Sequence, residues 1–267
     1  MGLFLLFPAG KRPSRAALRD FAQDQKAVSL THDPAEAEYP QLVEDADAHP
    51  QNSNATGPRP GSDLADRIWV ELLREGLTYD LVGLAQGSGC AFPRVDHKFD
   101  LDPQFAQSRY EALHLLPGHH LAGGQRTMPV VRGLIATARD LTHHFSHLEA
   151  VVWPASKSAI GRRFFESTTT AWLDGGPFPA LGLTAFRQSI DGAFQSVGLD
   201  FWIGQELRIE PSLVSDQVTA TRIGVRLINH LVLLGGLKKD DLVIAPDGSR
   251  LALNLSENGR YVRVRRG

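Results

Sequence analysis

The histidines are the residues whose types and spacing come nearest to a chemical site. His143 and His147 lie four residues apart within an amphipathic pattern, so on a helix both imidazoles would share one face, as pairs of metal ligands do. His119 and His120 are adjacent in a loop-like stretch and could supply the remaining ligands of a zinc ion. The histidine-rich segment 114–147 could therefore serve a metal-dependent or acid–base hydrolase.

Two features of the same segment count against a metal. Residues 144–146 are His, Phe and Ser, so the His-Glu-x-x-His motif is absent. Arg132 and Arg139 share the polar face of the expected helix, and cationic neighbours disfavour a bound cation. We therefore expect an exposed polar face that carries histidines and no cofactor, with zinc as the alternative.

Other short motifs fall short of a catalytic pattern. Residues 87–90 read Gly-Ser-Gly-Cys after an expected strand, but Phe and Pro at 92–93 stand where a dinucleotide fingerprint needs a third glycine opening a helix. Ser88 does not fit the Gly-x-Ser-x-Gly spacing of a nucleophile elbow, because Gln86 and Cys90 stand where the two glycines are needed. Ser and Lys at 156–157 are adjacent rather than three apart. The single cysteine, Cys90, excludes an internal disulfide, and we expect it to be inert.

Residues 198–210 give the clearest strand pattern, with apolar and polar residues in strict alternation. Trp202 falls on the polar side with Glu206 and Arg208, and a large aromatic ring among charges is a common interface anchor. These three residues are our candidate protein-contact patch. In the alternative interpretation a second layer covers this face, so that Trp202 belongs to the core and Glu206 and Arg208 form a structural ion pair.

The positions of apolar, capping and turn-forming residues predict the elements that must hold these side chains. In the first half they predict a strand at 3–7, a helix from Ser14 to about Gln25, a long loop at 31–62, a helix at 63–76, a strand at 79–84 and irregular chain at 86–125. In the second half they predict helices at 129–148, 160–172 and 214–234, a strand at 149–153, a hairpin of strands 242–245 and 250–255, and a strand at 261–265. Apolar residues on more than one face of the helix at 214–234 predict burial all round.

Composition bounds the class of protein. Of 267 residues, 42% are hydrophobic and 22% charged, which is ordinary for a globular chain. The formal charge of -2 argues against a nucleic-acid partner or an anionic membrane surface. No run of 18 apolar residues occurs, and the apolar start at 3–7 is too short for a signal peptide, so we expect a cytoplasmic protein.

Three segments of the second half follow an order that resembles a known family. Residues 151–154 read Val-Val-Trp-Pro, residues 197–199 and 204–209 carry Val-Gly-Leu and Gly-Gln-Glu-Leu-Arg-Ile, and residues 236–241 read Gly-Leu-Lys-Lys-Asp-Asp. The order is similar to that of a bacterial family of uncharacterised proteins, classed only as a domain of unknown function. Its members carry V-Y-W, then T-x-G-L-x-x-F-G-x-x-E-L-E-I, then L-K-D-G-D. The match covers about 126–250.

This chain departs from the family pattern at several positions. Ser196 stands for the Thr, Trp202 and Ile203 interrupt the Phe-Gly spacing, Arg208 replaces a Glu and Asp241 replaces a Gly. The resemblance implies a compact bacterial α+β domain. It implies no catalytic residues, because none are established for the family.

We expect an α+β fold with mixed sheets flanked by helices and a small β-rich C-terminal tail; the element order also allows two ferredoxin-like halves. The expected parts are an N-terminal part at 1–85, an irregular connection at 86–125 and a C-terminal part at 126–267, packed as one unit. The absence of a catalytic motif favours a non-enzymatic protein-binding factor of the immunity or accessory type. The alternative is the hydrolase described above. The sequence does not indicate an oligomeric state.

Overall fold

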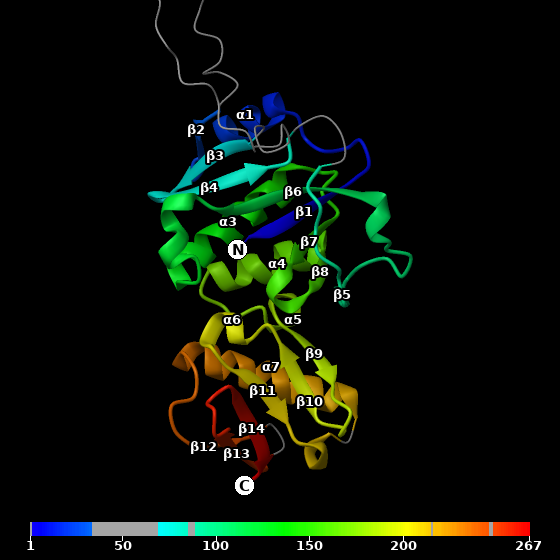
Figure 1. The fold of residues 1–267 in the computed structure, drawn as a ribbon, viewed down its shortest axis with the longest axis vertical. Helices are drawn as coiled ribbons and strands as arrows, with labels where there is room; N and C mark the ends of the chain where they lie inside the picture. Colours follow the sequence, from blue (N-terminus) through cyan, green and yellow to red (C-terminus); the bar gives the residue numbers. More distant parts are fainter. Residues whose placement is uncertain (1, 34–68, 85–88, 215, 246–247) are drawn as a thin grey trace, which may run out of the picture.

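The computed structural model describes residues 2–33, 69–84, 89–214, 216–245 and 248–267. Figure 1 shows two lobes stacked along the long axis, each built on one mixed sheet. The first lobe holds an eight-stranded sheet of order β2-β3-β4-β6-β1-β7-β8-β5, and the second a six-stranded sheet of order β12-β13-β14-β11-β10-β9. The expected α+β class is therefore confirmed. Both sheets are larger than the four-stranded sheet that a ferredoxin-like half would contain.

The first sheet is almost entirely antiparallel. Its strands are β1 (Leu3–Pro8), β2 (Ser29–His32), β3 (Trp69–Arg74), β4 (Leu77–Val82), β5 (His97–Phe99), β6 (Tyr110–Pro117), β7 (Ala150–Trp153) and β8 (Ser158–Gly161). Among the strands of this sheet that the structure describes, only β5 and β8 pair in parallel. β1 lies between β6 and β7 and is buried on both faces, which explains its unbroken run of Leu and Phe.

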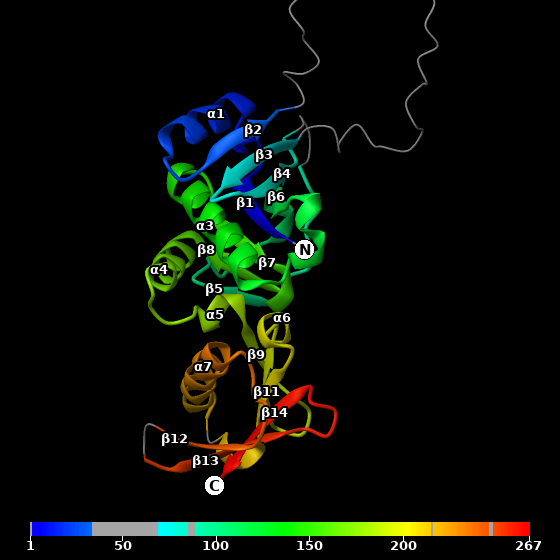
Figure 2. The same ribbon diagram turned by 90° about the vertical axis from the view of Figure 1, so that its left-hand side faces the viewer.

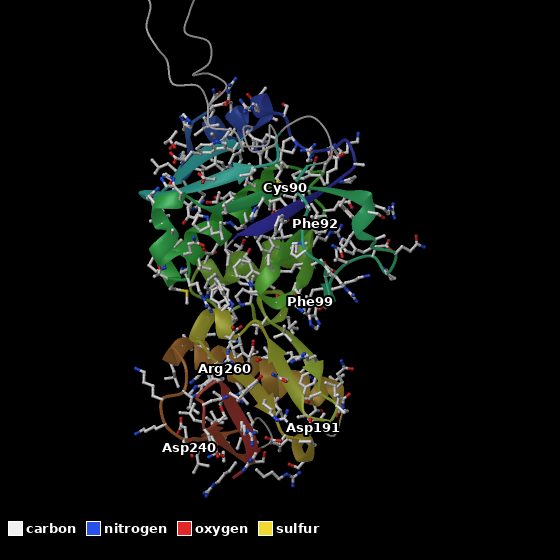
Figure 3. The ribbon with its side chains drawn as sticks, viewed as in Figure 1. Cys90, Phe92, Phe99, Asp191, Asp240 and Arg260 are labelled. Atoms are coloured by element: carbon white, nitrogen blue, oxygen red, sulfur yellow. The ribbon has the colours of Figure 1, made fainter. Side chains whose placement is uncertain are left out.

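Helices cover one face of this sheet and irregular chain covers the other. The helices are α1 (Arg15–Asp24), α3 (Met128–His144) and α4 (Arg162–Leu173), which Figure 2 shows on one side of the lobe. The segment from Gly89 to Arg109 covers the opposite face, where Phe105 is buried with Phe4, Leu6 and Val152. Cys90, Phe92 and Phe99, labelled in Figure 3, belong to this covering segment and to β5 within it. The central strands are therefore buried on both sides.

The second lobe is a sheet with one long helix. Its strands are β9 (Ala185–Gln188), β10 (Phe194–Val197), β11 (Glu206–Ile209), β12 (Asp241–Ile244), β13 (Arg250–Leu255) and β14 (Tyr261–Arg266), with β11 and β14 parallel. Helix α7 (Gln217–Leu234) covers one face. Its core includes Leu207, Ile209, Val262 and Val264 from the sheet and Leu227, Ile228 and Leu231 from the helix. Short helices α5 (Ala180–Leu183) and α6 (Asp200–Ile203) lie where the lobes meet.

Local signals located several elements correctly. Ser14 caps α1 by accepting a hydrogen bond from the N–H of Ala17, and Gly235 ends α7 with a left-handed φ of 69°. β1, β7, α4 and the hairpin of β12 and β13 also lie where the sequence predicts them. Helix α3 begins as predicted but ends at His144 rather than 148, so His143 and His147 do not share a helix face as the sequence predicts. The loop expected at 31–62 lies mostly outside the described residues, although His32 ends strand β2.

Three predicted elements are wrong. Residues 69–74 form β3 rather than a helix, because Glu75 and Gly76 adopt positive φ and turn the chain into a hairpin with β4. The stretch at 86–125 contains β5 and the central strand β6, which pairs with both β1 and β4. Residues 198–204 form a turn and the short helix α6, so the strand expected at 198–210 is only β11.

The boundaries between the predicted parts also move. β7 and β8 belong to the same sheet as β1, so the first lobe runs past the expected division at residue 126. The chain leaves the first lobe between α5 and β9. The prediction that α7 is buried all round is wrong as well, because Val218, Leu233 and Leu234 are exposed. Helix α7 buries one face only, against the second sheet.

Candidate functional sites

A polar cavity lies where the second lobe meets the first. It has a volume of about 410 Å³ and is lined by residues of both lobes, among them Lys157, Arg187, Gln195, Glu206, Arg260 and Tyr261. Lys157 belongs to the turn between β7 and β8 of the first lobe, and the others come from β9, β10, β11 and the start of β14. Figure 3 labels Arg260 in the second lobe, on the side that faces the first. We call this cavity the junction pocket.

Glu206 forms the floor of the junction pocket as a fully engaged carboxylate. Oε1 accepts a hydrogen bond from the N–H of Gly198 at 2.7 Å, and Oε2 accepts one from the N–H of Leu199 at 3.3 Å. The hydroxyl of Ser196 donates to Oε2 and itself accepts the N–H of Leu207 at 2.7 Å. Burial raises the pKa of Glu206, although the hydrogen bonds from Ser196 and Gly198 act in the opposite direction.

Two glycines shape the chain that wraps this carboxylate. Gly198 adopts a φ of +86°, and a Cβ there would lie 2.6 Å from the carbonyl oxygen of Ala155 in the first lobe. Gly204 adopts a φ of +75° and ends α6, which returns the chain to Glu206 and β11. The turn between β10 and β11 is therefore bent around Glu206 and pressed against the first lobe.

The cations of the junction pocket are only weakly paired. Lys157 Nζ lies 3.4 Å from a carboxylate oxygen of Asp96, and its side chain is largely exposed. Arg187 and Arg260 are exposed and form no ion pair with the described residues. Burial lowers the pKa of His97 on the neighbouring strand β5; the charges of Lys157 and Arg187 lower it further, against the opposing effect of Asp96. The pocket is thus rich in positive charge.

Trp202, one of the candidate contact residues, is partly buried and packs against aromatic rings of the first lobe. Its ring lies 4.8 Å from Phe178, 5.8 Å from Trp153 and 5.9 Å from Trp172, measured between ring centroids. All three partners belong to the first lobe, whereas Trp202 lies on α6. This arrangement matches the covered alternative considered from the sequence, because the ring helps to hold the two lobes together.

The other two candidate contact residues have separate surroundings. Arg208 forms an ion pair with Asp191 in the β9–β10 turn and lies 3.5 Å from Glu210. Glu206 engages backbone N–H groups and Ser196, so the expected pair between Glu206 and Arg208 is not among the ion pairs of the described residues. The three residues predicted as one patch therefore belong to the lobe junction, the pocket floor and the sheet surface.

A second candidate surface lies between α7 and the β12–β13 hairpin. An apolar groove of about 340 Å³ is lined by Ile223, Leu227, Val243, Ala245 and Leu251. Arg226 and His230 of α7 add polar groups to its wall, and the Nε2 atom of His230 is buried without a hydrogen-bond partner among the described residues. We call this surface the α7–β12 groove.

The edge of the second sheet adjoins this groove. β12 is the last strand of its sheet, so the backbone groups on one of its sides have no neighbouring strand among the described residues. Leu242 and Ile244 on this strand are 64% and 65% exposed. Arg250, Lys238 and Lys239 lie nearby in sequence and are exposed. On this strand the N–H of Leu242 donates to the side chain of the exposed Asp241 at 2.8 Å. The edge thus combines a backbone side without a neighbouring strand, exposed apolar side chains and several cations beside Asp241.

The histidines are divided between the two ends of α3. His119 and His120 lie in a 3₁₀ turn before its first residue, and the Nε2 atom of His120 is 3.4 Å from the hydroxyl of Thr78. His143 lies in the last turn of α3, with Nδ1 3.7 Å from Glu166, and His147 follows the helix end. Since α3 spans 17 residues, the structure does not bring the two pairs together. Within the described ranges, no three His, Cys, Asp or Glu side chains could jointly hold a metal ion.

Sequence reasoning missed the junction pocket almost entirely. Lys157, Arg187 and Arg260 lie in three unrelated segments without a common motif. Glu206 was singled out for a different role, and Lys157 was considered only with Ser156 as a catalytic pair. One available signal was the pair of glycines at 198 and 204, because a strand with two glycines indicates a bend or a close backbone approach.

No family model, no curated protein and no solved structure matches this chain. The resemblance of residues 126–250 to an uncharacterised bacterial family therefore stays a prediction. No helix in the part of the chain that the structure describes is long and apolar enough to cross a membrane.

Proposed function

We propose that this protein is a non-enzymatic protein-binding factor of the immunity or accessory type, and that it binds an extended segment of its partner at the edge of β12. The observation that carries the proposal is the exposure of Leu242 and Ile244 on an edge strand beside an apolar groove. Edge strands are normally protected by charged residues, by bulges or by a covering helix or loop, because their unpaired backbone groups can form hydrogen bonds with a strand of another chain.

The geometry of β12 suits the addition of a strand. An incoming segment would form hydrogen bonds with the free backbone side of β12, and alternate side chains would reach the α7–β12 groove. Val243 and Ile244 line that groove, and Leu242 and Ile244 are also exposed to solvent. The partner segment should therefore be apolar at alternate positions.

The charges around the edge indicate the rest of the partner's chemistry. Arg226 lines the groove, and Lys238, Lys239 and Arg250 are exposed without an ion pair among the described residues. Asp240 is occupied by the side chain of Asn254 and the N–H of Leu255. A partner segment with acidic residues beside its apolar ones would complement this surface.

The hydrolase alternative rests on imidazoles that lie at opposite ends of α3. His143 and His147 could act together only with groups near the end of that helix, such as Glu166. Protein binding at β12 has the more specific structural support, because free backbone, apolar side chains and cations lie together there.

The experiment uses site-specific photo-crosslinking followed by reconstitution. A photoreactive residue at Leu242 should capture a partner in a lysate of the source organism, whereas one at Ile190, which is fully exposed at the opposite side of the sheet, should not. The captured protein is then purified, and its affinity is measured by calorimetry. Ile244→Lys should weaken binding by about tenfold or more, and Ile190→Lys should leave it unchanged.

Two results would contradict the proposal. Equal weakening by the two lysine variants would show that the edge of β12 is not the contact. A purified candidate that fails to bind wild-type protein would show that the crosslink was incidental. The edge of β12 could instead bind a second copy of this chain. Sedimentation of the purified protein alone tests this, because wild-type protein would then self-associate and Ile244→Lys would not.

A further inference from the structure

We propose that the junction pocket binds a small molecule that carries a phosphate or carboxylate group. The cavity of about 410 Å³ falls within the range of small-molecule sites, and residues of both lobes line it. This inference concerns a different surface from the edge of β12 and does not depend on the proposed protein partner. It is carried by the hydrogen-bond donors of the cavity that are still free.

Two of the three cations in the pocket have no ion-pair partner among the described residues. Lys157, Arg187 and Arg260 converge from the two lobes, and Lys157 lies 3.4 Å from a carboxylate oxygen of Asp96. Glu206 is occupied by Ser196 and by backbone N–H groups and forms no ion pair with the two arginines. The guanidinium groups of Arg187 and Arg260 are therefore the cations that an anionic ligand could bind.

Gln195 supplies an independent indication of a ligand. Its side chain is only 7% exposed, it lines the pocket, and its amide forms no hydrogen bond with the described residues. A buried amide normally has a partner, because leaving its polar atoms unpaired costs free energy. Neither amide atom is a fully buried atom without a partner, so the amide keeps some access to solvent. The amide is therefore positioned to bind an incoming polar group.

A tight turn places Lys157 in the pocket. Lys157 adopts a left-handed conformation with φ 52° and ψ 36° and closes the turn between the antiparallel strands β7 and β8. Its carbonyl oxygen accepts the N–H groups of Asp96 and His97, which holds this turn against β5. The position of the lysine is therefore fixed by the backbone.

The chemistry of the donors identifies the ligand class. Two guanidinium groups with free N–H donors bind the oxygens of phosphate or carboxylate in a bidentate manner, and a lysine adds a point charge. Arg187 and Arg260 provide the former and Lys157 the latter. The amide of Gln195 and the hydroxyl of Tyr261 can bind the rest of the molecule. A small organic phosphate or carboxylate fits these groups.

The test is calorimetric titration of the purified full chain at low ionic strength with four probes. Glucose 6-phosphate and citrate represent the two anion sources, inorganic phosphate represents the bare anion, and glucose is the uncharged control. Wild-type protein should bind at least one organic anion saturably and more tightly than inorganic phosphate. Arg187→Gln and Arg260→Gln should each weaken that binding by about tenfold or more, because a charge-assisted pair is lost.

Arg222→Gln is the matched control, since Arg222 is exposed on α7, which covers the other face of the sheet. Equal weakening by this variant, or no saturable binding of any of the three anions, would overturn the inference. Preference for glucose 6-phosphate over citrate would identify a phosphate site, and the reverse a carboxylate site. Binding of the partner at β12 should persist in Arg187→Gln, so the two proposals can fail separately.

Discussion

Glu206 shows how one buried carboxylate can organise a turn. Its oxygens accept the N–H groups of Gly198, Leu199 and Asp200 and the hydroxyl of Ser196. These donors belong to the link between β10 and α6, which packs on the first lobe. The role of Glu206 is therefore structural, because its hydrogen bonds fix the turn that forms one wall of the junction pocket.

Glu206→Ala should destabilise the protein by about 2–4 kcal/mol, because it leaves several buried N–H groups without an acceptor. Glu257→Ala, in the exposed turn between β13 and β14, should change stability by less than about 0.5 kcal/mol. The free energy of unfolding is measured in urea for both variants. Equal stability of Glu206→Ala and wild type would mean that water replaces the carboxylate without cost.

His114 makes stability depend on pH. The imidazole stacks on Phe4 with ring centroids 4.2 Å apart, and burial lowers its pKa from 6.5 to about 4. Between about pH 4 and about pH 6.5, His114 is protonated in the unfolded chain but not in the folded chain. The contribution of His114 to stability is therefore fully present above about pH 6.5 and is lost as the pH falls towards 4. The contribution lost at about pH 5 is about 1 kcal/mol, because the ring is only partly buried.

His114→Phe keeps an aromatic ring against Phe4 and removes the titration. Urea unfolding at about pH 5 and about pH 7.5 should therefore show a smaller loss of stability on acidification in the variant than in the wild type. Glu206 has the opposite effect on the pH dependence of stability. Its pKa is raised by burial, so its contribution to stability is lost as the pH rises. An identical pH dependence in both proteins would contradict the role of His114.

At the scale of elements, close packing decides where helices lie against strands. A Cβ built on Gly133 of α3 would lie 2.0 Å from the hydroxyl oxygen of Tyr79 on β4. That hydroxyl is buried and donates to the carbonyl oxygen of Val130 at 3.0 Å. Burial also raises the pKa of Tyr79 to about 12. The absence of a side chain at Gly133 thus fixes how closely α3 approaches the sheet.

Gly133→Ala should cost about 2–4 kcal/mol, although helix propensity alone would favour alanine by about 1 kcal/mol. Gly123→Ala is the control, because a Cβ at Gly123 would meet no atom within 4 Å. Removing the hydroxyl in Tyr79→Phe/Gly133→Ala should recover part of the loss measured by urea unfolding. A stabilised Gly133→Ala would show that α3 can shift away from β4 freely.

At the scale of the whole molecule, a cluster of aromatic rings joins the lobes. Trp202 of α6 packs against Trp153, Trp172 and Phe178 of the first lobe, and its indole N–H lies 3.4 Å from the carbonyl oxygen of Leu183. Arg126 of the first lobe donates to the carbonyl oxygen of Asp200 at 2.7 Å and stacks on Phe201. Since the junction pocket lies at the same junction, its shape depends on this contact.

Trp202→Ala should lower the free energy of unfolding by about 3 kcal/mol and separate the unfolding of the two lobes. The loss follows from the cavity between the rings, and the separation follows from the weakened contact. Tryptophan fluorescence and circular dichroism should then give different midpoints in urea, whereas Ile190→Ala should leave the two signals coincident. Coincident signals with unchanged stability in Trp202→Ala would place Trp202 outside the contact that joins the lobes.

The sequence by itself determined the elements whose signals are local. Ser14 caps α1, a regular apolar period defines α3, and Gly235 ends α7, because each of these features acts within one or two turns of chain. The unbroken apolar run of β1 likewise indicated a strand buried on both faces. The α+β class follows from the mixture of these patterns.

Only the tertiary structure decided the remaining elements and the sites. Residues 110–117 contain leucine, alanine and glutamate, which also suit a helix, and they become β6 because β1 and β4 pair with them on both sides. The strand predicted at 198–210 is interrupted because the carboxylate of Glu206 accepts the N–H groups of Gly198 and Leu199, which holds these residues in a turn. Lys157, Arg187 and Arg260 are distant in sequence and meet only when the lobes pack, and no local pattern encodes that packing.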